Sequence, residues 1–176
     1  MKSRTLVCAV ALAALVAAPR PALPQQAAEN PLDQLAWMVG GTWKADGEKG
    51  PDGKPFHVEW SCRWGDNHRI LEFTTRFLIN GRLVPVYEGL YAWHPGKKKL
   101  IFVYTDNEGN LTEGAATMTG DHLEQEFDIV GVDGVAHPYR STIIRRGPDD
   151  YDWDVSSQKD GAWTQMFALK YKRNRT

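Results

Sequence analysis

Cysteine is scarce in this chain. Its 176 residues include only Cys8 and Cys62, and Cys8 lies in an N-terminal apolar run that we expect to be removed. A mature domain with one cysteine has no internal disulfide, so its fold must rest on a hydrophobic core, which a chain of about 150 residues can build. Cys62 alternates with Trp60 and Trp64, which predicts a buried small apolar side chain rather than a reactive thiol.

Sequence motifs of catalysis and cofactor binding are also missing. There is no Gly-x-Ser-x-Gly elbow, no phosphate-binding loop, no dinucleotide fingerprint and no zinc-ligand spacing. We therefore predict no catalytic residue, no metal site and no cofactor. The five histidines fall on different expected strands or turns: His57, His68, His94, His122 and His137.

Long apolar runs are limited to one segment, Leu6–Ala18, which follows the basic stretch Met1–Arg4. The run is shorter than the about 20 residues that cross a bilayer, and the pattern is typical of a secretory signal peptide. We expect cleavage between Ala22 and Ala28, a periplasmic or secreted product, and no integral membrane segment after processing. The expected division is a signal peptide and processing region over 1–24, a flexible linker over 25–30 and a folded domain over 31–176.

An excess of positive charge is absent too. Removing residues 1–24 takes away Lys2, Arg4 and Arg20, which leaves 18 basic residues against 22 acidic ones and a net charge of −4. Such a domain is not suited to binding nucleic acid through its overall field. The sequence does not indicate an oligomeric state.

Alternating apolar and polar residues dominate the chain after Gly40-Gly41. Segments rich in β-branched and aromatic residues end at short turn signals, of which Asn80-Gly81 is the strongest hairpin signal. Short connections make sequential strands antiparallel neighbours, and closure removes the open edges of a long meander. We predict an all-β antiparallel meander closed into a barrel of about ten strands, with a two-layer sandwich as the alternative. A bulge near Pro85 would reverse the faces of the residues after it.

A short helix precedes the first strand. Asn30 is placed to cap it, Pro31 suits its first position, and Gly40-Gly41 ends it. A helix leading into Gly41-Thr42-Trp43 resembles the Gly-x-Trp start of the calycin superfamily, which includes lipocalins, fatty-acid-binding proteins, avidins and nitrobindins. It also resembles uncharacterised exported bacterial domains with the same start.

The resemblance implies that the helix plugs one end of the barrel. In calycins the tryptophan packs against a basic residue of a late strand, and Lys170, Lys172 or Arg173 would take that place here by a cation–π contact. The residues expected to form the plug are Trp37, Gly41, Trp43, Lys172 and Arg173.

The resemblance also implies a ligand cavity, and hence an exported protein that binds a small hydrophobic or amphipathic molecule. Nitrobindins hold haem through a histidine near the C-terminal strands, but no histidine follows His137 here, so haem is not expected. The candidate lumen residues are Trp60, Phe73, Arg76, Phe77, Glu88, Phe102, Phe127, Tyr139, Arg140, Trp153 and Phe167.

Two other functions stay open from the residues alone. Glu88 falls on an otherwise apolar strand face, where a carboxylate must pair, reach water or protonate. With His137 it would form the acid–base pair of an enzyme that works inside the lumen. A barrel filled by its own aromatic side chains would instead be a structural or protein-interaction module.

Overall fold

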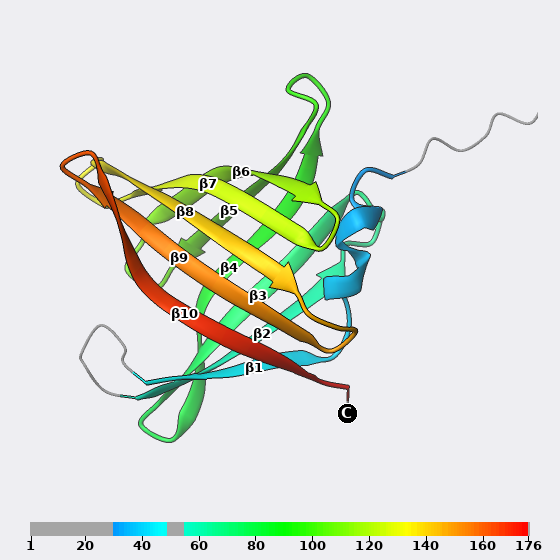
Figure 1. The fold of residues 1–176 in the computed structure, drawn as a ribbon, viewed down its shortest axis with the longest axis horizontal. Helices are drawn as coiled ribbons and strands as arrows, with labels where there is room; N and C mark the ends of the chain where they lie inside the picture. The colour runs from blue at the N-terminus through cyan, green and yellow to red at the C-terminus, as the bar shows by residue number, and fades with distance from the viewer. Residues whose placement is uncertain (1–29, 49–54, 176) are drawn as a thin grey trace, which may run out of the picture.

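A computed structural model describes residues 30–48 and 55–175 of the protein. The predicted signal peptide and nearly all of the predicted linker therefore lie outside the described residues. The described part is a 3-10 helix followed by ten strands (Figure 1). The elements are η1 (Asp33–Met38), β1 (Thr42–Gly47), β2 (Phe56–Trp64), β3 (Ile70–Ile79), β4 (Arg82–His94), β5 (Lys99–Asp106), β6 (Leu111–Thr119), β7 (His122–Val130), β8 (Ala136–Arg145), β9 (Asp150–Lys159) and β10 (Ala162–Asn174).

The strands form one closed antiparallel barrel. Each strand pairs with the next along the chain, and β1 pairs with β10. This confirms the predicted meander and barrel and excludes the two-layer sandwich. The closing seam is short, because it joins Thr42 to Asn174, Trp43 to Arg173 and Lys44 to Lys172.

Two tight hairpins follow from local backbone chemistry. Asn80 and Gly81 have φ values of 51° and 76°, and Asp160 and Gly161 repeat this with 52° and 79°. A two-residue turn with positive φ at both positions matches the twist of the flanking strands. The Asn-Gly and Asp-Gly pairs are therefore the reason that β3–β4 and β9–β10 turn so sharply.

A bulge interrupts β4 where the sequence predicted one. Thr75 pairs with Tyr87 while the next residue of β3, Arg76, pairs with Pro85, so Val86 has no partner on β3. One extra residue shifts the alternation of the strand. As a result Val84 and Tyr87 point to the same side of the sheet although they are three residues apart. A second bulge at Met166 separates Gln165 from Phe167 in β10.

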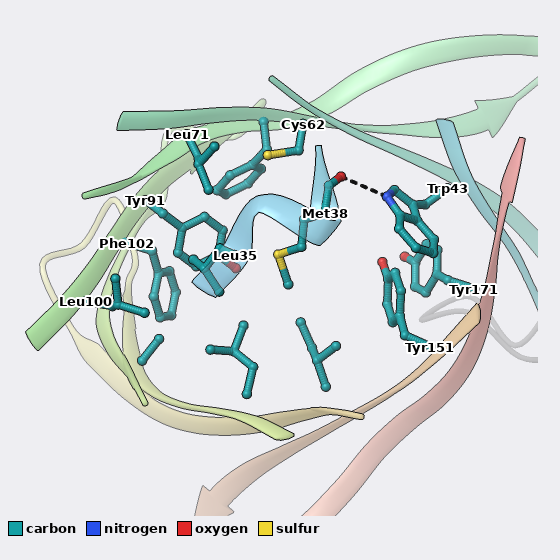
Figure 2. Close-up of a cluster of buried hydrophobic side chains, with 14 of the residues drawn as sticks. Leu35, Met38, Trp43, Cys62, Leu71, Tyr91, Leu100, Phe102, Tyr151 and Tyr171 are labelled. Carbon is teal, nitrogen blue, oxygen red and sulfur yellow. Dashed lines mark hydrogen bonds between the residues drawn. The ribbon is translucent and has the colours of Figure 1, made fainter. Parts of the chain in front are cut away.

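The core lies inside the barrel, on the faces that alternate inward along each strand. Figure 2 shows Leu35 and Met38 of η1 among side chains from the strands, with Trp43, Tyr151 and Tyr171 gathered at one side. The core residues that solvent scarcely reaches are Leu32, Leu35, Met38, Trp43, Ala45, Val58, Cys62, Leu71, Phe73, Tyr91, Leu100, Phe102, Ala116, Leu123, Phe127, Ile143, Tyr151, Val155, Leu169 and Tyr171.

The helix is a 3-10 helix and begins later than predicted. Leu32, not Asn30, is at the N-cap position and makes no side-chain cap. Asn30 instead accepts a hydrogen bond from the Leu32 backbone N–H at 3.2 Å through its side-chain oxygen. At the other end, Gly40 and Gly41 take φ values of 85° and 71°, which lets the chain turn from η1 into β1.

Candidate functional site

The two ends of the barrel are built differently. One end, which we call the η1 end, carries η1 and the turns at residues 65–69, 95–98, 120–121 and 146–149. The other end, which we call the mouth, is formed by the turns at residues 80–81, 107–110, 131–135 and 160–161. In Figure 1 the helix is blue and lies across the η1 end.

Trp43 is the centre of the η1 end. Its side chain is 0% exposed, and its indole Nε1 donates a hydrogen bond to the Met38 carbonyl oxygen at 3.0 Å (Figure 2). The Arg173 guanidinium lies over the Trp43 ring, with Cζ 4.1 Å from the ring centroid. Tyr151 packs on the same indole at 4.8 Å between centroids.

Arg173 links the last strand to the helix. Its guanidinium donates to the Val39 carbonyl oxygen at 3.2 Å and also to the Trp37 carbonyl oxygen. Its Nε lies 3.3 Å from Asp149 Oδ1 as an ion pair, but the N–H does not point at that oxygen and makes no hydrogen bond. Burial is the main cause that lowers the Arg173 pKa from its ordinary value, and the guanidinium stays charged at neutral pH.

The other residues expected at the plug fall in different places. Trp37 is half-buried and meets Trp43 edge to face at 5.8 Å. At Gly41 a Cβ would come within 2.5 Å of the Asn174 carbonyl oxygen, so only glycine fits beside the seam. Lys172 is exposed and pairs in register with Lys44 on the outer side. Whether this end is closed to a ligand stays a prediction.

A neutral hydrogen-bonded chain joins β4, β7 and β8 inside the barrel. The Ser141 hydroxyl donates to Gln125 Oε1 at 2.6 Å, and Gln125 Nε2 donates to the Tyr91 hydroxyl oxygen at 2.9 Å. All three residues are buried. Buried polar groups that satisfy one another in this way fix their orientation without introducing charge.

Toward the mouth, side chains that face inward are still reached by solvent. Phe77, Tyr87, Tyr104, Tyr139 and Phe167 lie on inner faces and are only partly buried. At the η1 end, by contrast, Leu32, Leu35 and Trp43 are 0% exposed. Trp64, Trp93 and Met118 at the η1 end are partly accessible as well, so the two ends differ in degree. Among the described residues, the side chains that are 0% exposed all lie toward the η1 end, and partly accessible inward side chains are more frequent toward the mouth.

Exposed apolar side chains gather beside the mouth turns. Among the described residues, every large hydrophobic side chain that is clearly exposed lies on a strand or loop next to one of those turns. Large contiguous apolar patches are uncommon on the surface of a monomer. The exposed side chains are Leu78, Ile79, Leu83, Leu111, Val132, Val135, Trp163 and Met166.

Most of the predicted lumen residues do face the inside of the barrel. Phe102 meets Phe127 at 5.6 Å, Phe127 stacks on Tyr139 at 5.6 Å, and Trp153 meets Phe167 at 5.1 Å. Their role in binding a ligand stays a prediction. The residues placed inside are Trp60, Phe73, Phe77, Phe102, Phe127, Tyr139, Trp153 and Phe167.

Three predicted lumen residues point outward, and this corrects their place in the list. Arg76 alternates with Phe77 and donates to the outer Ser61 hydroxyl at 3.2 Å. Arg140 alternates with Tyr139 and lies over the outer ring of Trp163, 4.6 Å from its centroid. A strand cannot turn two adjacent side chains to the same face, so neither arginine can join its aromatic neighbour in the lumen.

Glu88 is the third residue that points outward. It is exposed and lines a groove of ≈ 380 Å³ on the outer wall, together with Arg63 and Glu72, which form an ion pair. His137 lies on β8 beside the mouth, opposite Ile129, on the inner-face register. The structure therefore separates Glu88 and His137 by the barrel wall, and the acid–base pair predicted for a lumen enzyme is not formed.

Most of the inward-facing tyrosines were not among the lumen residues predicted from the sequence. All six tyrosines of the chain face inward, whereas only Tyr139 was predicted to. Burial raises the pKa of Tyr104 to about 12 and also raises that of Tyr87. The alternation of Tyr87, Gly89 and Tyr91 with outward Glu88 and Leu90 was the available signal.

Within 30–48 and 55–175, no group of three His, Cys, Asp or Glu side chains is arranged to hold a metal ion. No helix in that part of the chain has the length and apolar character needed to span a membrane.

Comparison with known proteins gives likeness of fold. The sequence matches no protein-family profile and no curated protein. Among solved structures, Rv2717c from M. tuberculosis superposes with a TM-score of 0.57 at 17% identity, covering 82% of this chain and 97% of that one. EF1p2_mFAP2b bound to DFHBI matches with a TM-score of 0.38 at 14% identity, covering 81% and 99%. The ten-strand antiparallel barrel fits the calycin-type architecture that the Gly-x-Trp start predicted.

Proposed function

We propose that the protein binds a small hydrophobic or amphipathic molecule in the barrel lumen and that the molecule enters through the mouth. The observation that carries this proposal is the partial exposure of inward-facing aromatic side chains toward the mouth. Phe77, Tyr104 and Tyr139 face inward toward the mouth and are partly accessible, while Trp43 toward the η1 end is fully buried. A barrel filled by its own side chains would bury both sets alike.

The chemistry of the half toward the mouth suits such a guest. Its walls are aromatic rings with hydroxyl groups at intervals, and ligand sites are mostly apolar with a few placed polar groups. Covering partly exposed aromatic surface yields about 25 cal/mol per Å², and rings that stack on a ligand add to this. The apolar side chains around the mouth give the same molecule an apolar path of entry.

A matched pair of substitutions tests the site. Thr75 faces inward opposite Trp60, whereas its neighbour Thr74 faces outward opposite Ser61. Thr75→Phe fills the lumen, and Thr74→Phe adds the same ring to the outer wall. Each purified protein is incubated with a bacterial lipid extract and examined by native mass spectrometry.

The expected result is a bound small molecule in the unmodified protein and in Thr74→Phe, and loss of that molecule in Thr75→Phe. Thermal unfolding of both variants provides the folding control. Equal capture by both variants places the molecule outside the lumen and contradicts the proposal. No capture by the unmodified protein from a lipid extract also contradicts it and favours the structural or protein-interaction module.

We further propose that binding takes place after export, which rests on the apolar and basic pattern of residues 1–24. Expression of the full chain in a Gram-negative host, followed by cell fractionation and N-terminal sequencing, tests this. A periplasmic product that begins between Ala22 and Ala28 supports it. An uncleaved product retained in the cytoplasm contradicts it.

A further inference from the structure

We infer that the lumen selects an uncharged ligand, a flat apolar molecule whose polar groups are hydroxyl or carbonyl rather than carboxylate, phosphate or ammonium. This inference rests on the proposed function and adds the chemical class of the ligand. It comes from where charged residues occur on the inner faces of the ten strands. The pairing of residues between neighbouring strands shows which side chains face inward.

Charged side chains with inward register occur, among the described strands, only at the two ends of the barrel. Between those ends, each inner face carries apolar residues, hydroxyls or an amide. The charged residues are Arg82, Asp106 and Lys159 beside the mouth turns, and Arg145 and Arg173 at the η1 end; the His137 imidazole also has inward register beside the mouth.

Three of the five charged groups at the ends have protein partners, and the other two, Arg82 and Lys159, are exposed to solvent beside the mouth. Asp106 accepts hydrogen bonds from the Asn110 side chain at 2.8 Å and from the Glu108 backbone N–H at 2.9 Å, within its own turn. Arg145 donates to the Gly147 carbonyl oxygen at 3.3 Å, and Arg173 donates to the carbonyl oxygens before β1. None of these three is directed into the middle of the barrel.

An ionic ligand in the middle of the lumen would therefore have no counter-charge. Removing an ion from water is costly unless it is paired and hydrogen-bonded. The polar groups that line the half toward the mouth are neutral: the hydroxyls of Thr75, Tyr87, Tyr104, Tyr139 and Ser157. Burial keeps the pKa of Tyr104 at about 12, so its hydroxyl stays neutral at physiological pH.

The flat shape follows from how the aromatic rings lie. Phe127 and Tyr139 stack with 13° between their planes, and Phe102 and Tyr104 with 14°. Rings that lie nearly parallel leave faces on which another planar group stacks. A ligand with a planar apolar body and an uncharged polar end satisfies both the rings and the hydroxyls.

Three fluorescent probes with one ring system separate charge from shape. They are anthracenemethanol, anthracenecarboxylate and anthracenemethylammonium, which at neutral pH are neutral, anionic and cationic. Each is titrated into the purified protein, and binding is followed by probe fluorescence and by energy transfer from tryptophan. We expect the neutral probe to bind at least about tenfold more tightly than either ion, a ratio set by the desolvation of an unpaired charge.

Two variants test whether the lumen itself sets this preference. Ser157 faces inward opposite Tyr139, and its neighbour Ser156 faces outward opposite Arg140. Ser157→Lys places a cation near the mouth inside the barrel, and Ser156→Lys places the same cation outside. We expect Ser157→Lys to improve binding of the carboxylate about tenfold relative to the neutral probe, and Ser156→Lys to leave the order unchanged.

The outcomes separate the two proposals. If the carboxylate or the ammonium probe binds the unmodified protein as tightly as the neutral probe, selection for an uncharged ligand is overturned while lumen binding stands. If Ser157→Lys leaves the ratio unchanged, the lumen does not set it and the inference is overturned. If none of the three probes binds and the lipid extract also gives no captured molecule, the proposed function itself is overturned.

Discussion

Arg173 lies over the indole of Trp43, with its guanidinium carbon 4.1 Å from the ring centroid. The two residues are also direct partners across the seam that closes the barrel. Arg173 also donates hydrogen bonds to the carbonyl oxygens of Trp37 in η1 and of Val39 just after it. This one side chain therefore joins the first strand, the last strand and the helix.

Replacing Trp43 by alanine is expected to cost about 3–5 kcal/mol of unfolding free energy. The side chain is fully buried, and its removal leaves a cavity bounded by Trp37, Tyr151 and the Arg173 guanidinium. Urea unfolding followed by circular dichroism measures the loss. Trp163→Ala is the control, since Trp163 is exposed and its loss is expected to cost well under half as much. Equal losses at the two positions would show that Trp43 has no special role.

Arg173→Lys is expected to lower the unfolding free energy by about 1–3 kcal/mol although it keeps the charge. An ammonium cannot reproduce the planar fork that lies on the indole and donates to two carbonyl groups at once. Lys172→Arg, on the outer face beside it, is the matched control and should change little. Chemical denaturation of both proteins decides this, and an unchanged midpoint for Arg173→Lys would mean that charge alone holds the seam.

Gly89→Ala is expected to destabilise the barrel by about 1–3 kcal/mol through overpacking. A Cβ at Gly89 would collide with the Val103 carbonyl oxygen and the Tyr104 Cβ, because β5 crosses close to it. At Gly147 a Cβ would have nothing nearer than Asp150 Oδ2 at 3.9 Å. Gly147→Ala should therefore be nearly neutral, and thermal unfolding of the two variants compares them directly.

Cys62 is expected to resist thiol reagents in the folded protein. Its side chain is 5% exposed, and burial raises its pKa from 9.0 to about 12, so little thiolate exists at about pH 8. In a Cys8→Ala background, labelling by a chromogenic disulfide reagent should be slow in buffer and fast in urea. Rapid labelling of the folded protein at that pH would contradict the buried placement of the thiol.

Alkaline pH is expected to weaken the fold through its buried tyrosines. Burial raises the pKa of Tyr91, Tyr151 and Tyr171 above the ordinary value of 10.0. The unfolded chain then loses protons that the folded protein keeps, so stability falls as pH rises above about 10. Urea midpoints at about pH 8 and about pH 11 measure this fall. Tyr171→Phe should make it shallower, and an unchanged slope would contradict this cause.

Much of the architecture could be predicted because it is written in short-range patterns. Asn80-Gly81 can adopt positive φ at both positions, and the alternation from Leu71 to Phe77 places one set of residues on one face. Short turns then allow only neighbouring antiparallel strands. Even the bulge after Pro85 was indicated, since proline removes a donor from the ladder.

The lumen could be predicted only in part. The alternation of side chains along a strand shows which residues share a face, but it does not show which face is the inner one. Arg76 and Phe77 were both proposed for the lumen although adjacent residues point to opposite faces. Glu88 was grouped with Val84, and the unpaired Val86 reverses that relation. The dipeptides Glu88-Gly89 and Glu113-Gly114 could have indicated which face of their strands is the inner one. In both, glycine faces the crowded interior and glutamate faces water.

The closing seam also sets the order in which the chain can finish folding. β1 has only β2 as a partner until residues 172–174 arrive, because those residues supply its other edge. A chain made from its N-terminus carries its first strand with one unpaired edge until residues 172–174 are in place. The barrel is therefore closed only once residues 172–174 are available, and the pairing of β1 with β2 alone must hold the first strand in place until then.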